Sequence, residues 1–403
     1  MDDLPIGRRV AYWRGRRKMS QQQFADVIGK SKSWVDKVER GVRSLDKMST
    51  MRTVADGLRV DLRLLLGKDV DAQGPSYLLD NVSVDAVRGA LARWGPARPG
   101  RQQSAPDLAD LRKSVNHAWL SYQHARYTDL VRFLPRLLHV AQQARMANPG
   151  EPELAQRLAE AYQIASAVLR KVGINDLAWM AADRALTASQ ATDDQLLTGA
   201  CAAQLGYALL SQGQPRHAME IGLTVADLIA SPTPLDASAA HLSVYGTLLI
   251  VAARGAAARG DADCVADLLD QVGKAAAVGD GRDHYRTVLS PITVDLARVA
   301  TTVELGEGAT LDPAAHQRLV EGTAFRRLPP GYRAAHLLDA ASAWAQAGDL
   351  PRAGRALVEA DRTAPAEVRH RPVGHELLAT LLRRSPALGA DVLRLAEAMG
   401  VGV

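Results

Sequence analysis

The stretch Met19–Gly41, MSQQQFADVIGKSKSWVDKVERG, decides the fold of the N-terminal part of this chain. Ser20 can cap a helix that begins at Gln21, because its hydroxyl can accept a hydrogen bond from one of the first unpaired backbone amides. Gly29 can end that helix with a positive φ, and Ser31 can cap a second one. The apolar residues of each helix share one face: Phe24, Ala25 and Ile28, then Val35 and Val38. This pattern predicts a helix-turn-helix, whose second helix enters the DNA major groove.

The polar residues of the second helix lie away from its apolar face. At about 100° per residue, the core direction falls between Val35 and Val38. The outward residues are Ser33, Asp36, Lys37 and Arg40, flanked by Lys32 and Trp34. An ordinary solvated helix face is the alternative interpretation, because charge on an exposed face is common. We favour a surface that contacts double-stranded DNA.

Charge is unevenly distributed along the 403 residues. Residues 1–70 contain 16 lysines and arginines against 9 aspartates and glutamates, whereas the other residues contain 33 against 35. The net charge of +5 therefore comes from the N-terminal segment. A polyanion would bind there and release counterions.

Composition indicates a soluble globular protein, with 47% hydrophobic and 23% charged residues. No apolar run reaches the roughly 18 residues of a membrane span, and the first ten residues lack an apolar signal core. Cys201 and Cys264 are 63 residues apart, without metal-type spacing, which suits a reducing compartment. We therefore expect a cytoplasmic protein with no membrane partner.

Further helices are expected around the central pair. They cover residues 4–18, 47–58 and 61–66, with a polar loop at 42–46. Residues 6–67 resemble the Cro/cI-type, or XRE-family, helix-turn-helix domain, closely so over SQxxFAxxIGxSxSxVxxxERG and the tail LRVDLRLLLG. The resemblance implies a five-helix, lambda-repressor-like domain.

The resemblance also implies roles for individual residues. Gln21 should touch a phosphate, and Arg43 should reach the DNA backbone. Base edges should be faced by Lys32, Ser33 and Lys37. Arg14 and Glu39 occupy positions that pair within the family fold. Trp34 departs from the family pattern, and we expect it to pack on the neighbouring helix rather than against DNA or a partner.

Two breaks follow this domain. Residues 67–76, GKDVDAQGPS, form a short linker, a helix is expected over 77–94, and GPARPGRQQSAP at 95–106 forms a second break. The helix between them is either a spacer or a dimerisation element. The predicted organisation is therefore a DNA-binding domain at 1–67, a linker with one helix at 68–106, and a third region at 107–403.

The third region shows a helical pattern with a recurrence. A glycine that ends a long helix is followed five residues later by a small or apolar residue that starts the next packed face. The glycines, 40, 47, 46 and 42 residues apart, are Gly173, Gly213, Gly260, Gly306 and Gly348. Such spacing indicates about six or seven stacked helical hairpins, and so a curved superhelix with a concave face.

The last unit, residues 334–365, resembles a tetratricopeptide (TPR) repeat in AAHLLDAASAWAQAGDLPRAGRALVEADRTAP. Leu337 and Trp344 lie on its first helix, Ala353 and Ala360 on its second, and Pro365 closes it. Residues 202–232 are a second fair match. The other helices are longer than a repeat of about 34 residues allows. The resemblance implies an all-α chain with a TPR-like α-solenoid.

No catalytic or metal motif is present. GKS at residues 29–31 resembles the end of a phosphate-binding loop, but Phe24 stands where that loop needs a glycine. The pairs His217 with Glu220 and His336 with Asp339 are interpreted as satisfied surface pairs, since each lacks further ligands. We expect no enzyme activity, no cofactor and no bound metal.

Polar residues within the later helices suggest a ligand groove. Asn116 and Gln123 share a helix face, and His241 and Tyr245 form an i, i+4 pair in an apolar helix. His284 and Tyr285 are expected to open another helix. Hydrogen-bonded contacts between helices are the favoured alternative, because buried polar groups are generally paired. As a hypothesis, Asn116, Gln123, His241 and Tyr245 line the groove.

Together these features predict a sequence-specific transcriptional regulator that binds an operator as a homodimer. A peptide, a small molecule or a protein bound by the TPR-like region would modulate operator binding. The resemblance is to bacterial regulators of this build, several of which are receptors for peptide pheromones. The alternative is a TPR-type interaction scaffold with weak, secondary DNA binding.

Overall fold

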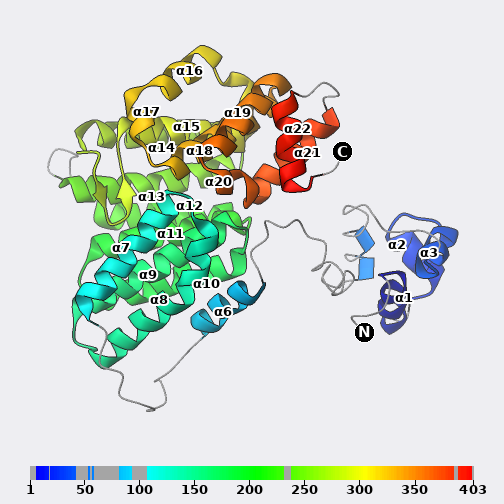
Figure 1. Cartoon of the computed structure of the whole chain (residues 1–403), viewed down its shortest axis with the longest axis horizontal. Helices are drawn as coiled ribbons and strands as arrows, with labels where there is room; N and C mark the ends of the chain where they lie inside the picture. Colours follow the sequence, from blue (N-terminus) through cyan, green and yellow to red (C-terminus); the bar gives the residue numbers. More distant parts are fainter. Residues whose placement is uncertain are drawn as a thin grey trace. The chain divides into compact units, whose positions relative to one another are not determined.

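A computed structural model describes residues 6–17, 19–41, 53–54, 57–58, 81–92, 107–230, 237–384 and 389–401. The chain divides into two compact units, residues 1–76 and 77–403. The described residues are almost wholly helical, apart from one pair of two-residue strands (Figure 1). The predicted all-α class is confirmed.

The N-terminal unit contains the predicted helix-turn-helix. Helix α1 covers Ile6–Arg16, α2 covers Gln21–Val27 and α3 covers Lys32–Glu39. The Ser20 hydroxyl accepts a hydrogen bond from the Gln23 amide at 3.2 Å, and the Ser31 hydroxyl accepts one from the Trp34 amide at 3.1 Å. Gly29 has φ +64° in the turn. Ser20 and Ser31 therefore cap their helices, and Gly29 adopts the positive φ of the turn, as the sequence predicted.

A small core joins these helices. Its fully or nearly fully buried residues are Val10, Phe24, Ala25, Ile28, Val35, Val38, Val54 and Leu58. A Cβ on Gly7 would lie 2.1 Å from the carbonyl oxygen of Val38, so α1 lies directly against the end of α3. The predicted helices at 47–58 and 61–66 and the loop at 42–46 lie mostly outside the described residues. The residues of this segment that the structure describes, 53–54 and 57–58, are helical.

The second unit, hereafter the body, is a succession of antiparallel helices. Its elements are α6 (Asn81–Ala92), α7 (Leu108–Gln123), α8 (Tyr127–Ala147), α9 (Pro152–Lys171), α10 (Asn175–Ser189), α11 (Gln195–Ser211), α12 (Pro215–Ile229), α13 (Ala239–Ala257), α14 (Ala262–Val278), β1 (Asp283–His284), β2 (Thr287–Val288), α15 (Pro291–Leu305), η2 (Gly308–Thr310), α16 (Pro313–Glu321), α17 (Thr323–Arg327), α18 (Pro330–Gln346), α19 (Leu350–Thr363), α20 (Pro365–Arg369), α21 (Pro372–Arg384) and α22 (Ala390–Met399).

The predicted glycines end helices as expected. All five adopt the left-handed conformation, with φ between 72° and 81°. Four of them join packed hairpins, namely α9–α10, α11–α12, α13–α14 and α18–α19. The first helices of successive hairpins also contact one another, from α7 through α9, α11, α13 and α15 to α18. These six helices form the inner row of the body.

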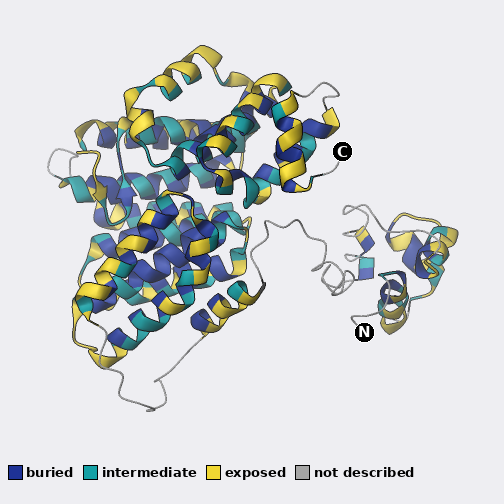
Figure 2. Ribbon diagram, in the orientation of Figure 1, coloured by how far each residue is buried: buried dark blue, intermediate teal, exposed yellow. Residues whose placement is uncertain are grey.

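The unit after Gly306 departs from the expected hairpin. α15 ends at Gly306, a short 3-10 turn follows, and α16 contains no buried residue, as Figure 2 shows by its colour. α16 has only nine residues, and its large apolar side chains, Leu319 and Val320, are half-buried. It therefore lacks the long apolar stripe that a packed second helix needs.

A β-hairpin stands where the sequence indicated a helix start. β1 pairs with β2 in antiparallel register, with His284 opposite Thr287. The two turn residues, Tyr285 and Arg286, have φ of 53° and 64°. The expectation that His284 and Tyr285 open a helix was therefore wrong. Two consecutive side-chain-bearing residues at positive φ strain the backbone.

The helix after the first linker belongs to the body. The buried residues of α6 are Val87, Ala90 and Leu91, and it packs against α8 and α10. Among the described helices, only α13 is long and apolar enough by composition to cross a membrane. This helix packs against α11, α12, α14 and α15, and 61% of its apolar 18-residue stretch is buried, as in a core helix.

The end of the body returns to its beginning. α18 contacts α7, and a Cβ on Gly331 would lie 2.9 Å from the carbonyl oxygen of Gln123. Fully buried Glu367 of α20 accepts hydrogen bonds from the Tyr127 hydroxyl of α8 and, at 2.6 Å, from Lys171 Nζ of α9. The inner row is thereby closed into a ring of helices.

Candidate nucleic-acid interface and interior cavity

The outward face of α3 carries the side chains that the sequence placed there. Lys32, Ser33, Lys37 and Arg40 are exposed, and Val35 and Val38 of the same helix are buried. Asp36 is half-buried and accepts a hydrogen bond from Arg40 at 3.3 Å. This i, i+4 ion pair holds two outward side chains in one arrangement. The surface is thus basic and polar, on a helix seated firmly in its domain.

Glu39 fixes the orientation of α3. Its carboxylate accepts hydrogen bonds from Arg14 Nε at 2.5 Å and Arg14 Nη2 at 3.0 Å, and from Gln21 Nε2 at 2.9 Å. Arg14 also donates to the carbonyl oxygen of Met19 at 2.7 Å. The hydrogen bond with Glu39 raises the pKa of Arg14, which stays charged. One carboxylate therefore joins α1, α2 and α3, and the implied Arg14–Glu39 pair is confirmed.

Two of the residues singled out in this domain have contacts within the protein. The Gln21 amide, expected at a phosphate, donates to Glu39 in the free protein. Trp34 is half-buried against the domain core, with Lys30 Nζ 6.0 Å from its ring centroid, as expected for packing within the domain. Arg43 lies outside the described residues.

The body contains a hollow of about 350 Å³, hereafter the interior cavity. Every helix of the inner row contributes to its wall, together with the β-hairpin. The polar and aromatic residues that line it are Trp119, Tyr122, Gln123, Arg170, Lys171, Gln204, Tyr207, Thr247, Arg254, Tyr285, Arg286, Thr287, Thr293, Tyr332, His336, Asp339 and Arg371. Its volume is at the low end of the range of about 300–1,000 Å³ for ligand pockets.

Positive charge predominates in this wall. It carries five cationic side chains and one carboxylate, that of Asp339. Three carboxylates behind the wall pair with four of the cations. Arg254 donates to Glu304 at 2.8 Å, Lys171 and Arg371 share Glu367, and Arg286 lies 3.4 Å from Glu160. Arg170 forms no ion pair within the described part of the chain and lies over the Tyr207 ring at 5.2 Å.

Several polar groups of the cavity wall have no partner among the described residues. Asp339 forms no hydrogen bond or ion pair there, and neither do the hydroxyls of Tyr122, Tyr207 and Tyr332. Burial raises the pKa of each of these three tyrosines, so their hydroxyls remain protonated donors at neutral pH. Burial likewise raises the pKa of Asp339, against the opposing effect of nearby Arg371, Arg254 and Lys171.

The structure separates the four residues of the expected ligand groove. Gln123 lines the interior cavity, and Asn116 accepts a hydrogen bond from Arg286 of the cavity wall at 2.6 Å. His241 is exposed in the first turn of α13 and hydrogen-bonds Ser238. Tyr245 contacts Gln271 of α14 at 3.5 Å. Neither His241 nor Tyr245 is among the residues that line the cavity.

Sequence reasoning missed most of the cavity residues. His336 and Asp339 were interpreted as a satisfied surface pair, and this was wrong, because both line the cavity and His336 is 2% exposed. Burial lowers the pKa of His336 to about 3, so its ring is neutral. A signal was present, since the buried face of α18 carries two ionisable side chains among alanines and leucines. No group of three or more metal-ligating side chains occurs within the described ranges.

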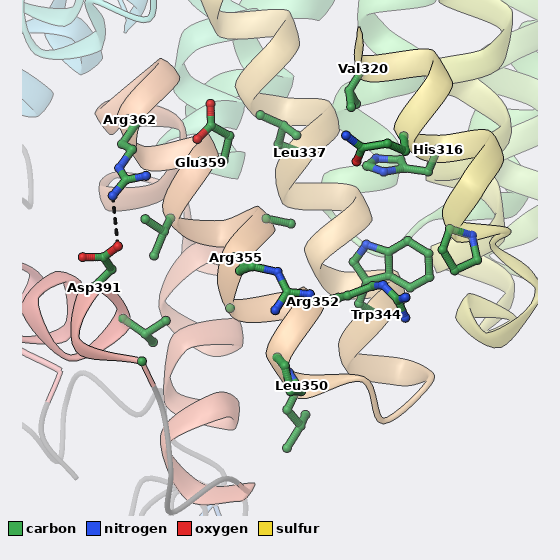
Figure 3. A pocket seen from close by; sticks show the side chains of 18 of the residues that line it. His316, Val320, Leu337, Trp344, Leu350, Arg352, Arg355, Glu359, Arg362 and Asp391 are labelled. Atoms are coloured by element: carbon green, nitrogen blue, oxygen red, sulfur yellow. Dashed lines mark hydrogen bonds and ion pairs between the residues drawn. The ribbon is translucent and has the colours of Figure 1, made fainter.

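A second, larger hollow of about 790 Å³ lies between α16, α18, α19 and the start of α22 (Figure 3). Two of the five charged side chains that line it, Arg362 and Asp391, pair with each other. Arg362 donates to Asp391 at 3.0 Å, and Arg352 lies 5.7 Å from the centroid of Trp344. His316 meets Trp344 edge-on and stacks on His336.

Comparisons with known proteins agree with the N-terminal assignment. Residues 5–66 match the protein family described as "Helix-turn-helix domain". No curated protein matches the chain. A solved structure, "Crystal Structure of Bacillus thuringiensis PlcR in complex with the peptide PapR7 and DNA", is similar at 12% identity and a TM-score of 0.34, covering 79% of this chain and 93% of that chain.

Fold and sites together define the class of protein. It is an all-α protein in which a helix-turn-helix domain precedes a body of stacked helical hairpins.

Proposed function

We propose that this protein is a sequence-specific DNA-binding transcriptional regulator whose operator binding is modulated by an effector bound in its TPR-like body. The observation that carries the proposal is the geometry of α3. Its polar and basic side chains are exposed together, while Glu39, Val35 and Val38 hold the helix in place. Such a face can read base edges in the major groove.

The proposed unit of binding is a homodimer. A single recognition helix contacts only a few base pairs, and a two-fold dimer covers two half-sites one helical turn apart. Sequencing the DNA fragments that the purified protein retains from its own genome would supply the operator and its symmetry. A site without two related halves would contradict the dimer. The protein is proposed to act in the cytoplasm, in contact with the DNA that it regulates.

Lys37→Ala is expected to weaken operator binding by about 1–3 kcal/mol, because the exposed ammonium lies on the outward face of α3 and is proposed to contact a base. Titration of the operator duplex and of a random duplex at one salt concentration measures this. Lys274→Ala removes the same charge from an exposed position on α14 and should change neither affinity. An equal loss on both duplexes would mean that Lys37 contacts only phosphate.

The same titration separates this proposal from an interaction scaffold with secondary DNA binding. A scaffold would associate with both duplexes weakly, to a similar degree, and with a steep dependence on salt. A regulator should prefer the operator by about 10³-fold or more.

A further inference from the structure

We infer that the interior cavity binds a small amphipathic anion, that is, a carboxylate or phosphate group attached to a compact apolar body. This inference deepens the proposed effector control and rests on it only for the link to DNA binding. Binding itself follows from the cavity.

The charge of the wall favours an anion. Four of its five cationic side chains form ion pairs with Glu160, Glu304 or Glu367. The fifth, Arg170, has no carboxylate partner among the described residues. The guanidinium of Arg170 is held in place over the Tyr207 ring instead. Arg170 is half-buried and its Nε is fully buried, so the absence of a counter-ion is costly, and an anionic ligand would reduce that cost. A guanidinium also suits the planar, two-oxygen geometry of carboxylates and phosphates.

The hydrogen-bonding groups point the same way. Five buried side-chain atoms of the wall have no hydrogen-bond partner among the described residues: Trp119 Nε1, Arg170 Nε, Gln204 Oε1 and both ring nitrogens of His336. The hydroxyls of Tyr122, Tyr207 and Tyr332 also lack a protein partner there. Most of these groups are donors, the buried acceptors being Gln204 Oε1 and one ring nitrogen of neutral His336, which accords with an acceptor-rich ligand. Native proteins leave few buried polar groups unsatisfied, so their concentration at one cavity calls for a bound partner.

The β-hairpin supplies independent support. Its strained tip, Tyr285 and Arg286, reaches into the wall of the cavity. Contacts on both residues hold the tip: the Tyr285 hydroxyl donates to Asp194 at 2.9 Å, and Arg286 donates to Asn116 at 2.6 Å. Backbone strain retained by surrounding contacts is concentrated at functional sites.

The size and the remaining lining define the rest of the ligand. A volume of about 350 Å³ lies at the low end of the range of about 300–1,000 Å³ for ligand pockets, which suits a small metabolite. The apolar part of the wall is formed by Ala200, Ala203, Ile250, Val288, Leu296, Ala297, Ala300, Leu328, Pro329 and Ala335. A compact apolar body would be buried against it.

The test uses the full-length protein without DNA and matched probes. Phenylacetate and phenyl phosphate carry the two candidate anionic groups, phenylacetamide is the neutral counterpart, and inorganic phosphate lacks the apolar body. Calorimetric titration should show at least one of the two aromatic anions binding tenfold or more tightly than both phenylacetamide and inorganic phosphate. The better of the two identifies the group. If neither anion is preferred to the amide, or neither binds, the inference fails.

Two substitutions should act in opposite directions. Arg170→Met should weaken binding of the preferred anion at least tenfold, whereas Asp339→Asn should leave it unchanged or tighten it, because a carboxylate that repels the anion is removed. Arg216→Met, on the exposed face of α12, should have no effect. Equal weakening by Arg170→Met and Asp339→Asn would indicate a merely structural role for both. If Arg170→Met fails to fold, Tyr332→Phe replaces it, with a severalfold loss expected.

Operator affinity is then measured with and without the bound anion. If the anion binds but operator affinity is unchanged, the inferred cavity site stands and the proposed effector control fails. If no anion binds the protein but the operator is still bound specifically, the cavity inference fails and the proposed regulator stands.

Discussion

Glu367→Ala is expected to destabilise the body by about 3–5 kcal/mol, because removal of one partner from a buried ionic cluster leaves the other charges uncompensated. Glu367 is fully buried and accepts hydrogen bonds from Lys171 Nζ at 2.6 Å and Arg371 Nη1 at 2.8 Å, as well as from the Tyr127 hydroxyl. Its loss would also open the contact that closes the ring. Scanning calorimetry of the full chain would show the transition of the body at a lower temperature.

A matched control is Glu220→Ala, which removes the same charge from a pair whose side chains are 76% and 54% exposed. Glu220→Ala should change the free energy of unfolding of the body by no more than about 1 kcal/mol. In a double-mutant cycle, Glu367→Ala should cost less in a Lys171→Met background, since one fewer buried charge is left without a partner. Additive losses would show that Lys171 and Glu367 are not coupled.

The same cluster predicts a pH dependence. Burial by itself would raise the pKa of Glu367, but Lys171 and Arg371 outweigh burial and lower it to about 2 from an ordinary 4.5. Because the folded-state pKa lies below the unfolded one, the carboxylate contributes stability above about pH 4.5 that is lost as the pH falls toward 2. The difference in melting temperature between wild type and Glu367→Ala should therefore shrink over that window. A constant difference would contradict the depressed pKa.

The parts of the fold that the sequence predicted depend on local signals. Ser20, Ser31 and Gly29 each determine one capping bond or one backbone torsion within three or four residues, so the helix-turn-helix could be located without tertiary information. The recurrent glycines act in the same way. Gly306 shows the limit of this reasoning, because it ends its helix as predicted while the next helix lacks the apolar stripe to pack beside it.

The cavity depends on closure of the ring, which no local pattern encodes. Arg170, Tyr207 and Asp339 come from three inner-row helices and line one cavity, which Asp339 reaches on α18, the helix that returns to α7. Polarity within an apolar helix selected His241, which lies in an exposed first turn, whereas Gln123, selected on a polar helix face, lines the cavity. The hairpin tip could not be predicted from the sequence either, because Tyr and Arg are not typical of a turn with two positive φ values.

Glu39→Ala is expected to abolish specific operator binding near physiological temperature, although Glu39 is proposed to touch no DNA. Glu39 is 5% exposed, and its loss would leave the Arg14 guanidinium and the Gln21 amide without their shared acceptor. The expected cost of about 3–5 kcal/mol is a large part of the roughly 5–15 kcal/mol that stabilises a domain. α3 would then lose its fixed orientation against α1 and α2.

Hydrogen exchange measured on peptides from α1 to α3 isolates this effect from the body, since it reports the opening free energy of each segment. Asp36→Ala is the matched control: it removes a carboxylate from the same helix, but from a pair whose side chains are 64% and 39% exposed. The opening free energy of α3 should then change by no more than about 1 kcal/mol. Cooling or a stabilising osmolyte should restore operator binding to Glu39→Ala and not to Lys37→Ala, because only the first defect lies in folding. Equal protection in the Glu39 and Asp36 variants would show that the shared carboxylate does not hold the reading helix in place.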